Sequence, residues 1–193
     1  MGDIVFADII KQDSKDALKA LKKLGIAKTV MMTGDKEEIA KDIASKAGID
    51  TVYSRLMPDE KANIVSELQK NGSTVVYTGD GINDAPVLSQ ADVGVAMGGA
   101  GSDIAVEASD MVIMGDSLSK LAIGKKVAKK TIRIVHENII FAIAVKLLII
   151  IGCAIGIFDE NAMWLAVFGD VGVCLIAIAN SLRALRVGKI KNK

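Results

Sequence analysis

The sequence has few of the side chains that build disulfide frameworks or thiolate and imidazole metal clusters. Among 193 residues there are two cysteines and one histidine. Cys153 and Cys174 lie inside apolar segments and form no CxxC or other close pair, which predicts small core residues. His136 comes just before the first apolar segment and is expected to cap it rather than bind a ligand. Because the formal net charge is only +1, nucleic acid is not an expected partner.

The sequence also lacks a recognisable signal peptide, internal repeats and low-complexity segments. Its first ten residues, MGDIVFADII, are acidic and have no basic flank. The mean hydropathy of +0.38 is high for a soluble domain, although 24% of the residues are charged. The two values are compatible because the charges gather before about residue 137 and the apolar mass follows it. We therefore predict four parts: an α/β domain over 1–117, a basic connecting helix over 118–137, an apolar hairpin over 138–180 and a basic tail over 181–193.

Short apolar runs alternate with amphipathic stretches before residue 117. The runs TVMM and TVVY are typical of strands, whereas PDEKANIVSELQKNG is typical of a helix with Pro58 in its first turn and Gly72 past its end. Strands that are apolar throughout and alternate with helices predict a Rossmann-like parallel sheet covered on both faces. Ligands of such sheets bind at the carboxyl ends of the strands. Two TGD triplets, Thr33–Asp35 and Thr78–Asp80, fall at those ends.

Two apolar runs, about 138–157 and 162–179, are each long enough to cross a bilayer as a helix. A short polar turn, FDEN, joins them. Lysines and arginines flank the two outer ends, and the joining turn has only acids. The positive-inside rule therefore predicts two transmembrane helices in the plasma membrane with both termini in the cytoplasm. The alternative is a hairpin buried in the core of a soluble protein.

The stretch TGDGINDAP predicts a magnesium site at a strand tip. Asp80 ends the strand and Asp84 returns from the next helix, so two carboxylates meet where Mg²⁺ prefers one or two of them. Thr33 and Gly34, at the other strand tip, are placed to donate hydrogen bonds to a phosphate, whose charge Lys61 is placed to neutralise. The helix N-terminus after Asp84 adds a favourable dipole for phosphate. The alternative for any one of these turns is a plain loop.

The apolar hairpin carries two charges, Lys146 and Asp170, about eight residues from the cytoplasmic end of each segment. A charge at the bilayer centre costs about 2.5–3.5 kcal/mol. In an antiparallel hairpin both charges lie at one depth, where they lower each other's cost by pairing. We interpret them as a cation site, in which Asp170 ligates a divalent cation and Lys146 is its counter-ion when the cation leaves. The alternative is a purely structural ion pair.

These motifs together resemble the phosphorylation domain of P-type ATPases, which has the haloacid-dehalogenase-like fold. The resemblance rests on MMTGD, PDEKANIV, VVYTGDGINDAPVLSQADVGVAMG and ASDMVIM, and it covers essentially the whole chain. It implies that Asp80 ligates Mg²⁺ and that Asn83 and Asp84 complete the magnesium and phosphate site. It also implies roles for the residues of the other strand tip and the following helix: Thr33, Gly34 and Asp35 contact the phosphoryl group, and Lys61 pairs with the phosphorylated aspartate.

The last apolar segment, WLAVFGDVGVCLIAIANSLRALR, is similar to the last membrane helix of the zinc, cadmium and lead subgroup of these pumps. In that subgroup a DxG motif supplies a metal ligand, and Asp170 and Gly172 match it. The preceding helix of the subgroup carries a lysine, which Lys146 matches. The methionine and serine motif of the copper subgroup is absent. The resemblance therefore implies zinc, cadmium or lead as the transported metal.

The sequence contains no DKTGT motif, whose aspartate is the family's phosphate acceptor, and no equivalent DxD motif. The nucleotide-binding domain of the family precedes the region that this chain matches. Without the acceptor's strand, the sheet is expected to have a gap or an exposed edge. We therefore expect the C-terminal part of a heavy-metal pump, either a truncated product or half of a split protein, that does not autophosphorylate alone and uses ATP only with the missing N-terminal part. The alternatives are a non-catalytic, membrane-anchored module that binds Mg²⁺ or phosphate or regulates a full-length pump and, more weakly, a free-standing phosphatase.

Overall fold

A computed structural model describes residues 12–79, 82–98, 103–115, 117–157 and 162–185. The chain divides into two compact units, Met1–Ala122 and Ile123–Lys193, and each is treated by itself below. Asp80 and the FDEN turn lie outside the described residues, and so does most of the predicted basic tail.

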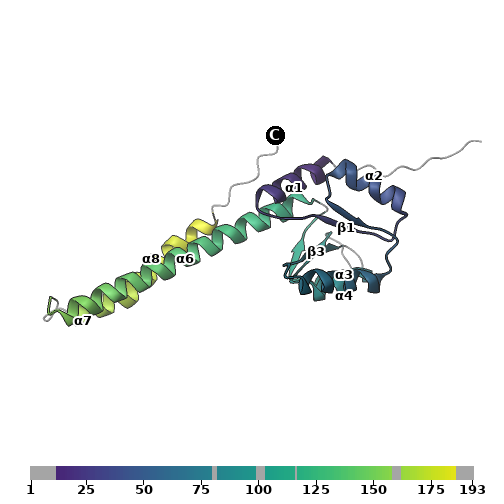
Figure 1. The fold of residues 1–193 in the computed structure, drawn as a ribbon. Coiled ribbons are helices and arrows are strands. Elements are labelled where there is room, and N and C mark those ends of the chain that lie inside the picture. Colours follow the sequence, from purple (N-terminus) through teal and green to yellow (C-terminus); the bar gives the residue numbers. More distant parts are fainter. Residues whose placement is uncertain (1–11, 80–81, 99–102, 116, 158–161, 186–193) are drawn as a thin grey trace, which may run out of the picture. The chain divides into compact units, whose positions relative to one another are not determined.

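The first unit alternates helices and strands along the chain, as the sequence predicts (Figure 1). Its elements are α1 (Gln12–Lys23), β1 (Val30–Met32), α2 (Glu37–Ala47), β2 (Thr51–Tyr53), α3 (Pro58–Lys70), β3 (Val76–Gly79), the 3-10 turn η1 (Ile82–Asp84), α4 (Ala85–Gln90), β4 (Val93–Met97), α5 (Asp103–Glu107) and β5 (Met111–Ile113).

The helix ends follow local chemistry. Helix α3 begins with Pro58, and the Glu60 carboxylate accepts a hydrogen bond of 2.7 Å from the Met57 backbone N–H, which satisfies a donor that the helix leaves without a partner. Helix α2 ends at Gly48, whose φ of 80° lies in the left-handed region that favours glycine. Its Ala40, Ala44 and Ala47 side chains form a buried stripe at helical spacing.

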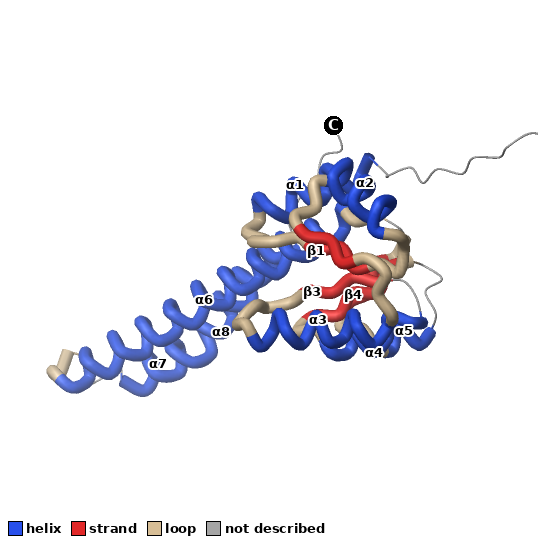
Figure 2. Tube along the Cα trace, turned by 45° about the vertical axis from the view of Figure 1, so that its right-hand side comes forward, coloured by secondary structure: helices blue, strands red, loops and turns tan. Residues whose placement is uncertain are grey.

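The strands form two parallel sheets rather than one. Strand β1 pairs with β2, and β3, β4 and β5 form the second sheet in that order. Figure 2 shows β1 apart from β3 and β4. The residues that the structure describes include no ladder between β1 and β3, so the gap expected from the missing strand lies between these two sheets.

A shared apolar cluster nevertheless links the two sheets. Val65 of α3 and Val87 of α4 are fully buried at its centre. Met32 from β1 and Tyr77 from β3 pack against this cluster from separate sheets. The strand edges are therefore held in one α/β unit by side chains rather than by backbone hydrogen bonds.

The second unit is a helical hairpin. Helix α6 (Ser119–Ala154) starts in the first unit and runs without a break through the predicted connecting helix and the first apolar segment. The returning arm contains α7 (Ala162–Val167), the π-helical turn η2 (Phe168–Gly172), α8 (Val173–Ser181) and the 3-10 turn η3 (Leu182–Leu185). Helices of 36 and 23 residues, Ser119–Ala154 and Met163–Leu185, are long and apolar enough to cross a membrane.

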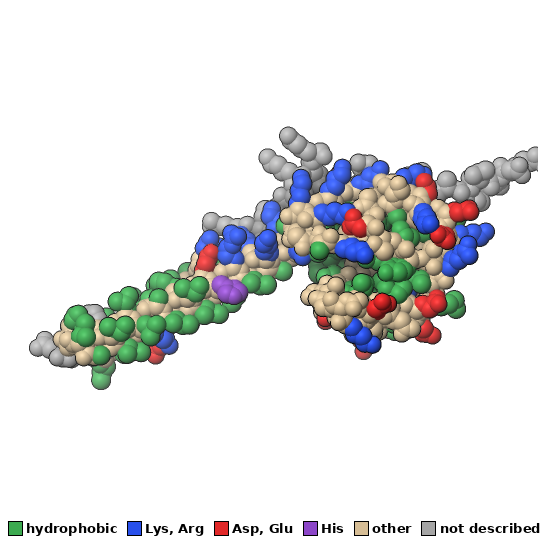
Figure 3. Space-filling view, in the orientation of Figure 1, with side chains coloured by type: hydrophobic (Ala, Val, Ile, Leu, Met, Phe, Trp, Pro, Cys, Tyr) green, Lys and Arg blue, Asp and Glu red, His purple; other side chains and the backbone are tan. Residues whose placement is uncertain are grey.

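The apolar side chains of the hairpin are exposed. In the most apolar 18-residue segment of each candidate span, only 6% and 11% is buried. The face of the hairpin that Figure 3 shows is largely hydrophobic. A core hairpin of a soluble protein would bury these side chains. The hairpin therefore has the surface of a membrane-embedded element.

Candidate functional sites

The first candidate site is centred on the carboxylate of Asp84, at the end of η1. Lys61 of α3 donates from Nζ to Asp84 Oδ1 at 2.8 Å, and the Tyr77 hydroxyl of β3 donates to the same oxygen at 2.8 Å. The side chains of Lys61 and Asp84 are 16% and 14% exposed. Three elements that are separate in sequence thus converge on one largely desolvated carboxylate, which Lys61 neutralises.

Gly79 makes room for this carboxylate. A Cβ added at Gly79 would lie 2.9 Å from both Cβ and Oδ2 of Asp84. The side chain of any other residue would therefore displace Asp84. The second glycine of TGDG, Gly81, and its neighbour Asp80 lie outside the described residues.

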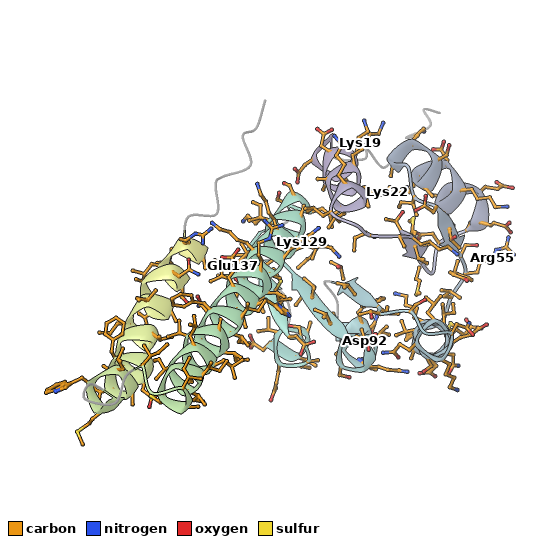
Figure 4. The ribbon with its side chains drawn as sticks, turned by 60° about the vertical axis from the view of Figure 1, so that its left-hand side comes forward. Lys19, Lys22, Arg55, Asp92, Lys129 and Glu137 are labelled. Atoms are coloured by element: carbon orange, nitrogen blue, oxygen red, sulfur yellow. The ribbon has the colours of Figure 1, made fainter. Side chains whose placement is uncertain are left out.

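The second TGD triplet forms a compact turn after β1. The Thr33 hydroxyl donates to Asp35 Oδ2 at 2.7 Å, and the Asp35 backbone N–H donates to Thr33 Oγ1 at 3.1 Å. The Arg55 backbone N–H donates to the Asp35 carbonyl at 2.9 Å, and Arg55 has a φ of 57°, which is uncommon for a residue other than glycine. Figure 4 shows Arg55 at the outer end of the α/β unit. Thr33 and Asp35 are therefore oriented by each other and by the chain after β2.

The described contacts bring Lys61 and Asp84 together but do not join them to Thr33, Gly34 or Asp35. Gly34 has ordinary space, because an added Cβ would lie 3.5 Å from the nearest atom, the Leu56 carbonyl oxygen. Asn83 is exposed beside Asp84. Among the described residues no group of three or more metal-ligating side chains gathers. The donor set fits Mg²⁺ in kind, because Asp84 presents a carboxylate at the carboxyl end of a parallel strand.

The second candidate site is an ion pair in the hairpin. Lys146 Nζ of α6 and Asp170 Oδ1 of η2 are 2.8 Å apart. Their side chains are 56% and 69% exposed, so the pair lies on the outer face of the hairpin and not between its helices. The opposite charges predicted at one depth are thus in direct contact.

Asp170 stands on a π-helical turn that two glycines shape. A Cβ at Gly169 would lie 2.6 Å from Cδ1 of Ile149 on α6, and a Cβ at Gly172 would lie 2.9 Å from the Phe168 ring. Gly169 is buried, so the two helices approach closely beside the ion pair. π-Helical turns are rare and occur frequently at functional sites.

Several side chains at these sites were not predicted from the sequence. Tyr77 belongs to the apolar run before TGDG. Its hydroxyl was the only signal in the sequence for a hydrogen bond to a residue outside the strand. On the hairpin, Asn138 and Asn180 form hydrogen bonds between the helices. Two asparagines within apolar segments were a signal for such a contact, since unpaired amides are costly in a membrane.

Three comparisons relate this chain to known proteins. Residues 1–92 match the family model of haloacid dehalogenase-like hydrolases. A "Cadmium, zinc and cobalt-transporting ATPase" of Bacillus subtilis (strain 168) is 47% identical over 100% of this chain and 27% of its own length. A "Zinc-transporting ATPase" of Synechocystis sp. (strain ATCC 27184 / PCC 6803 / Kazusa) is 46% identical over 94% of this chain and 25% of its own length.

The solved structures agree with the sequence relatives. The crystal structure of a zinc-transporting PIB-type ATPase in its E2.Pi state matches 93% of this chain and 28% of its own length, with a TM-score of 0.84 and 33% identity. The fold and the sequence thus relate this chain to the P-type ATPases, and its α/β unit has the haloacid-dehalogenase-like fold. Within that family, the chain is homologous to the heavy-metal-transporting members and spans about a quarter of the length of the curated relatives it matches.

Proposed function

We propose that this chain is the C-terminal part of an ATP-driven pump that exports zinc, cadmium or lead. The observation that carries the proposal is the Lys146–Asp170 pair, 2.8 Å apart in an otherwise apolar hairpin. Charged side chains in membrane segments mark ion pathways, because their cost in hydrocarbon is high. The relatives' printed names, which include zinc and cadmium, support the same class of cargo.

The ion pair provides a simple cycle for a divalent cation. When the cation arrives, Asp170 ligates it and releases Lys146. When the cation leaves, the Lys146 ammonium returns to the carboxylate, so that Asp170 is never left uncompensated in a medium of low dielectric. Lys146 therefore lowers the free energy of the state without a bound cation, and it competes with the transported cation for Asp170.

In the α/β unit we assign the magnesium half of a phosphoryl-transfer site. Asp80 and Asp84 would hold Mg²⁺, with Asn83 completing the site, and Thr33, Gly34 and Asp35 would contact the phosphoryl group. When bound, Mg²⁺ neutralises the charge that develops on the transferred phosphoryl group. Lys61 holds the Asp84 carboxylate through its Nζ, and we propose that it shares its charge with the phosphoryl group. Tyr77 fixes the same carboxylate from β3.

The acceptor aspartate of the proposed pump would lie outside these 193 residues. The chain has no DKTGT motif, and without it we expect no phosphoenzyme. Two features support a partner. The described strands leave β1 and β3 in separate sheets although Met32 and Tyr77 share one apolar cluster, which suits a parallel strand between them. The exposed Lys146–Asp170 pair would face lipid unless further membrane helices cover it.

We propose a plasma-membrane location with both termini in the cytoplasm, from the basic residues that flank the outer ends of the hairpin. The first test is cation binding by the whole chain in lipid nanodiscs, measured with Cd²⁺ by equilibrium dialysis. We expect one Cd²⁺ site that is lost in Asp170→Asn and strengthened in Lys146→Met, because the competing ammonium is removed. Equal binding by the parent chain and by Asp170→Asn would overturn the membrane metal site.

The alternative, a non-catalytic module that regulates a full-length pump, makes a different prediction. Affinity purification from membranes separates the two: recovery of an N-terminal half with a DKTGT motif supports the pump part, and recovery of an intact pump supports the module.

A further inference from the structure

A network of polar groups joins the two arms of the hairpin at its open end, opposite the turn that connects them. We call it the polar clasp, and its members are Glu137, Asn138, Ala177, Asn180, Ser181 and Arg183. Figure 4 shows Glu137 on α6, near the end of α8.

Asn138 is the centre of the polar clasp. Its side-chain amide donates to the Ala177 carbonyl oxygen at 3.2 Å and to the Ser181 hydroxyl at 3.1 Å. Its Oδ1 accepts a hydrogen bond of 2.8 Å from the Asn180 amide. One side chain of α6 thus uses both its donor and its acceptor groups on α8.

The outer part of the polar clasp is ionic. Arg183 donates to Glu137 Oε2 at 3.1 Å and to Asn180 Oδ1 at 2.7 Å. Asn180 therefore accepts from Arg183 while it donates to Asn138. These hydrogen bonds share their partners, so a slip of one helix along the other would break several of them together.

Stretches of similar length separate the polar clasp from the ion pair on the two helices. Lys146 follows Asn138 by eight residues on α6, a rise of about 12 Å. Asp170 precedes Asn180 by ten residues, and part of this interval is the π-helical turn, which takes up extra residues because its hydrogen bonds span i to i+5. A shift of one residue would move the helices by about 1.5 Å and would move the backbones that carry the 2.8 Å contact out of alignment.

We propose that Asn138 and Asn180 are positioning residues that set the register of α6 against α8 and thereby hold Lys146 opposite Asp170. The role in metal handling rests on the proposed function, whereas the register does not. Hydrogen bonds suit this task in a membrane, because apolar packing against lipid gives helices little preference for one register over another.

The test uses the whole chain in lipid nanodiscs with Cys153 and Cys174 replaced by alanine. Spin labels at Leu148 of α6 and Leu175 of α8, both exposed, report the distance between the helices. We expect Asn138→Leu to broaden or shift the distance distribution, and Asn180→Leu to have the same effect. The double variant should show no larger change than either single variant. Ile140→Ala, at an exposed position two residues from Asn138, is the control and should leave the distribution unchanged.

Cadmium affinity supplies a readout that loss of stability alone would not change. In folded samples we expect Asn138→Leu to weaken Cd²⁺ binding about threefold to tenfold, the range of hydrogen bonds between membrane helices. It should have no effect in an Asp170→Asn background. A distance distribution of Asn138→Leu identical to that of the parent would overturn the positioning role. If Asp170→Asn leaves cadmium binding unchanged, the proposed metal site is wrong, and the distance measurement still decides the role of the clasp.

Discussion

Lys61 and Tyr77 donate to one and the same oxygen of Asp84, each at 2.8 Å. The carboxylate is therefore fixed from a helix and from a strand at once. Because the Lys61–Asp84 pair is only about one-seventh exposed, removal of the lysine would leave a poorly solvated charge.

We expect Lys61→Met to destabilise the α/β unit by about 1–3 kcal/mol, the cost of leaving a buried polar group short of one partner, because Tyr77 still donates to Asp84. Pulse proteolysis in urea measures this free energy of unfolding on the whole chain. The matched control is Lys41→Met, which removes an exposed pair with Glu37 and should cost less than about 0.5 kcal/mol. Equal effects of the two substitutions would contradict the account of Asp84.

Tyr77→Phe isolates the second bond to Asp84. Loss of one hydrogen bond to a charged group predicts a destabilisation of about 1.5–3 kcal/mol in the same assay, at the lower end if water replaces the hydroxyl. Tyr53→Phe is the control, because no hydrogen bond of its hydroxyl occurs within the described part of the chain. A Tyr77→Phe variant as stable as the parent would show that the hydroxyl does not hold Asp84.

Gly94 is required by the packing of β4 under α4. A Cβ added there would lie 2.3 Å from the Leu88 carbonyl oxygen, a backbone atom that cannot turn away. We expect Gly94→Ala to destabilise the α/β unit by about 3 kcal/mol, the upper part of the range for overpacking. Gly34→Ala, whose added Cβ has an ordinary contact, should be nearly neutral for stability, and a comparable loss in both variants would refute the packing argument.

The α/β unit should lose stability in acid partly through Asp50. Hydrogen bonds from Lys22 and then from Thr29 hold the pKa of the Asp50 carboxyl well below its usual range; Lys22 is seen on α1 in Figure 4. Since the folded state favours the ionised form, this contribution is fully present above the unfolded pKa of about 3.9 and is lost as the pH falls below it.

The measurement compares the free energy of unfolding of the parent chain and of Asp50→Asn from pH 6 to pH 3. The difference between them should be constant near pH 6 and shrink as the pH falls below about 4. A difference that grows towards low pH would have the wrong sign for a carboxyl that is stabilised as its anion.

Much of the fold follows from periodicity in the sequence. The alternation of apolar runs and amphipathic stretches predicts the α/β unit, and the two long apolar segments predict the hairpin, because both signals are local. Local patterns do not predict which side chains meet across the fold. The convergence of Lys61, Tyr77 and Asp84 depends on the packing of α3 against α4 and of α4 against β3, and it appears only in three dimensions.

The hairpin shows the same limit. Lys146 and Asp170 were matched by counting residues from the helix ends, which requires only regular helices. The π-helical turn under Asp170 and the close contact of Gly169 with Ile149 are departures from that regularity, and the glycines that allow them do not by themselves predict a π-helical turn. Helix α6 runs on across residue 137, since a change from basic to apolar residues does not itself end a helix.

We propose that the chain supplies the magnesium half and part of the metal site of a pump whose acceptor aspartate lies outside these 193 residues. Phosphorylation by labelled ATP with Mg²⁺ tests it most directly, in membranes that contain this chain alone or together with an N-terminal half bearing DKTGT. We predict acid-stable label on the N-terminal half only when both are present, stimulated by Zn²⁺ or Cd²⁺ and insensitive to these metals in Asp170→Ala. Acid-stable label on this chain by itself would contradict the account.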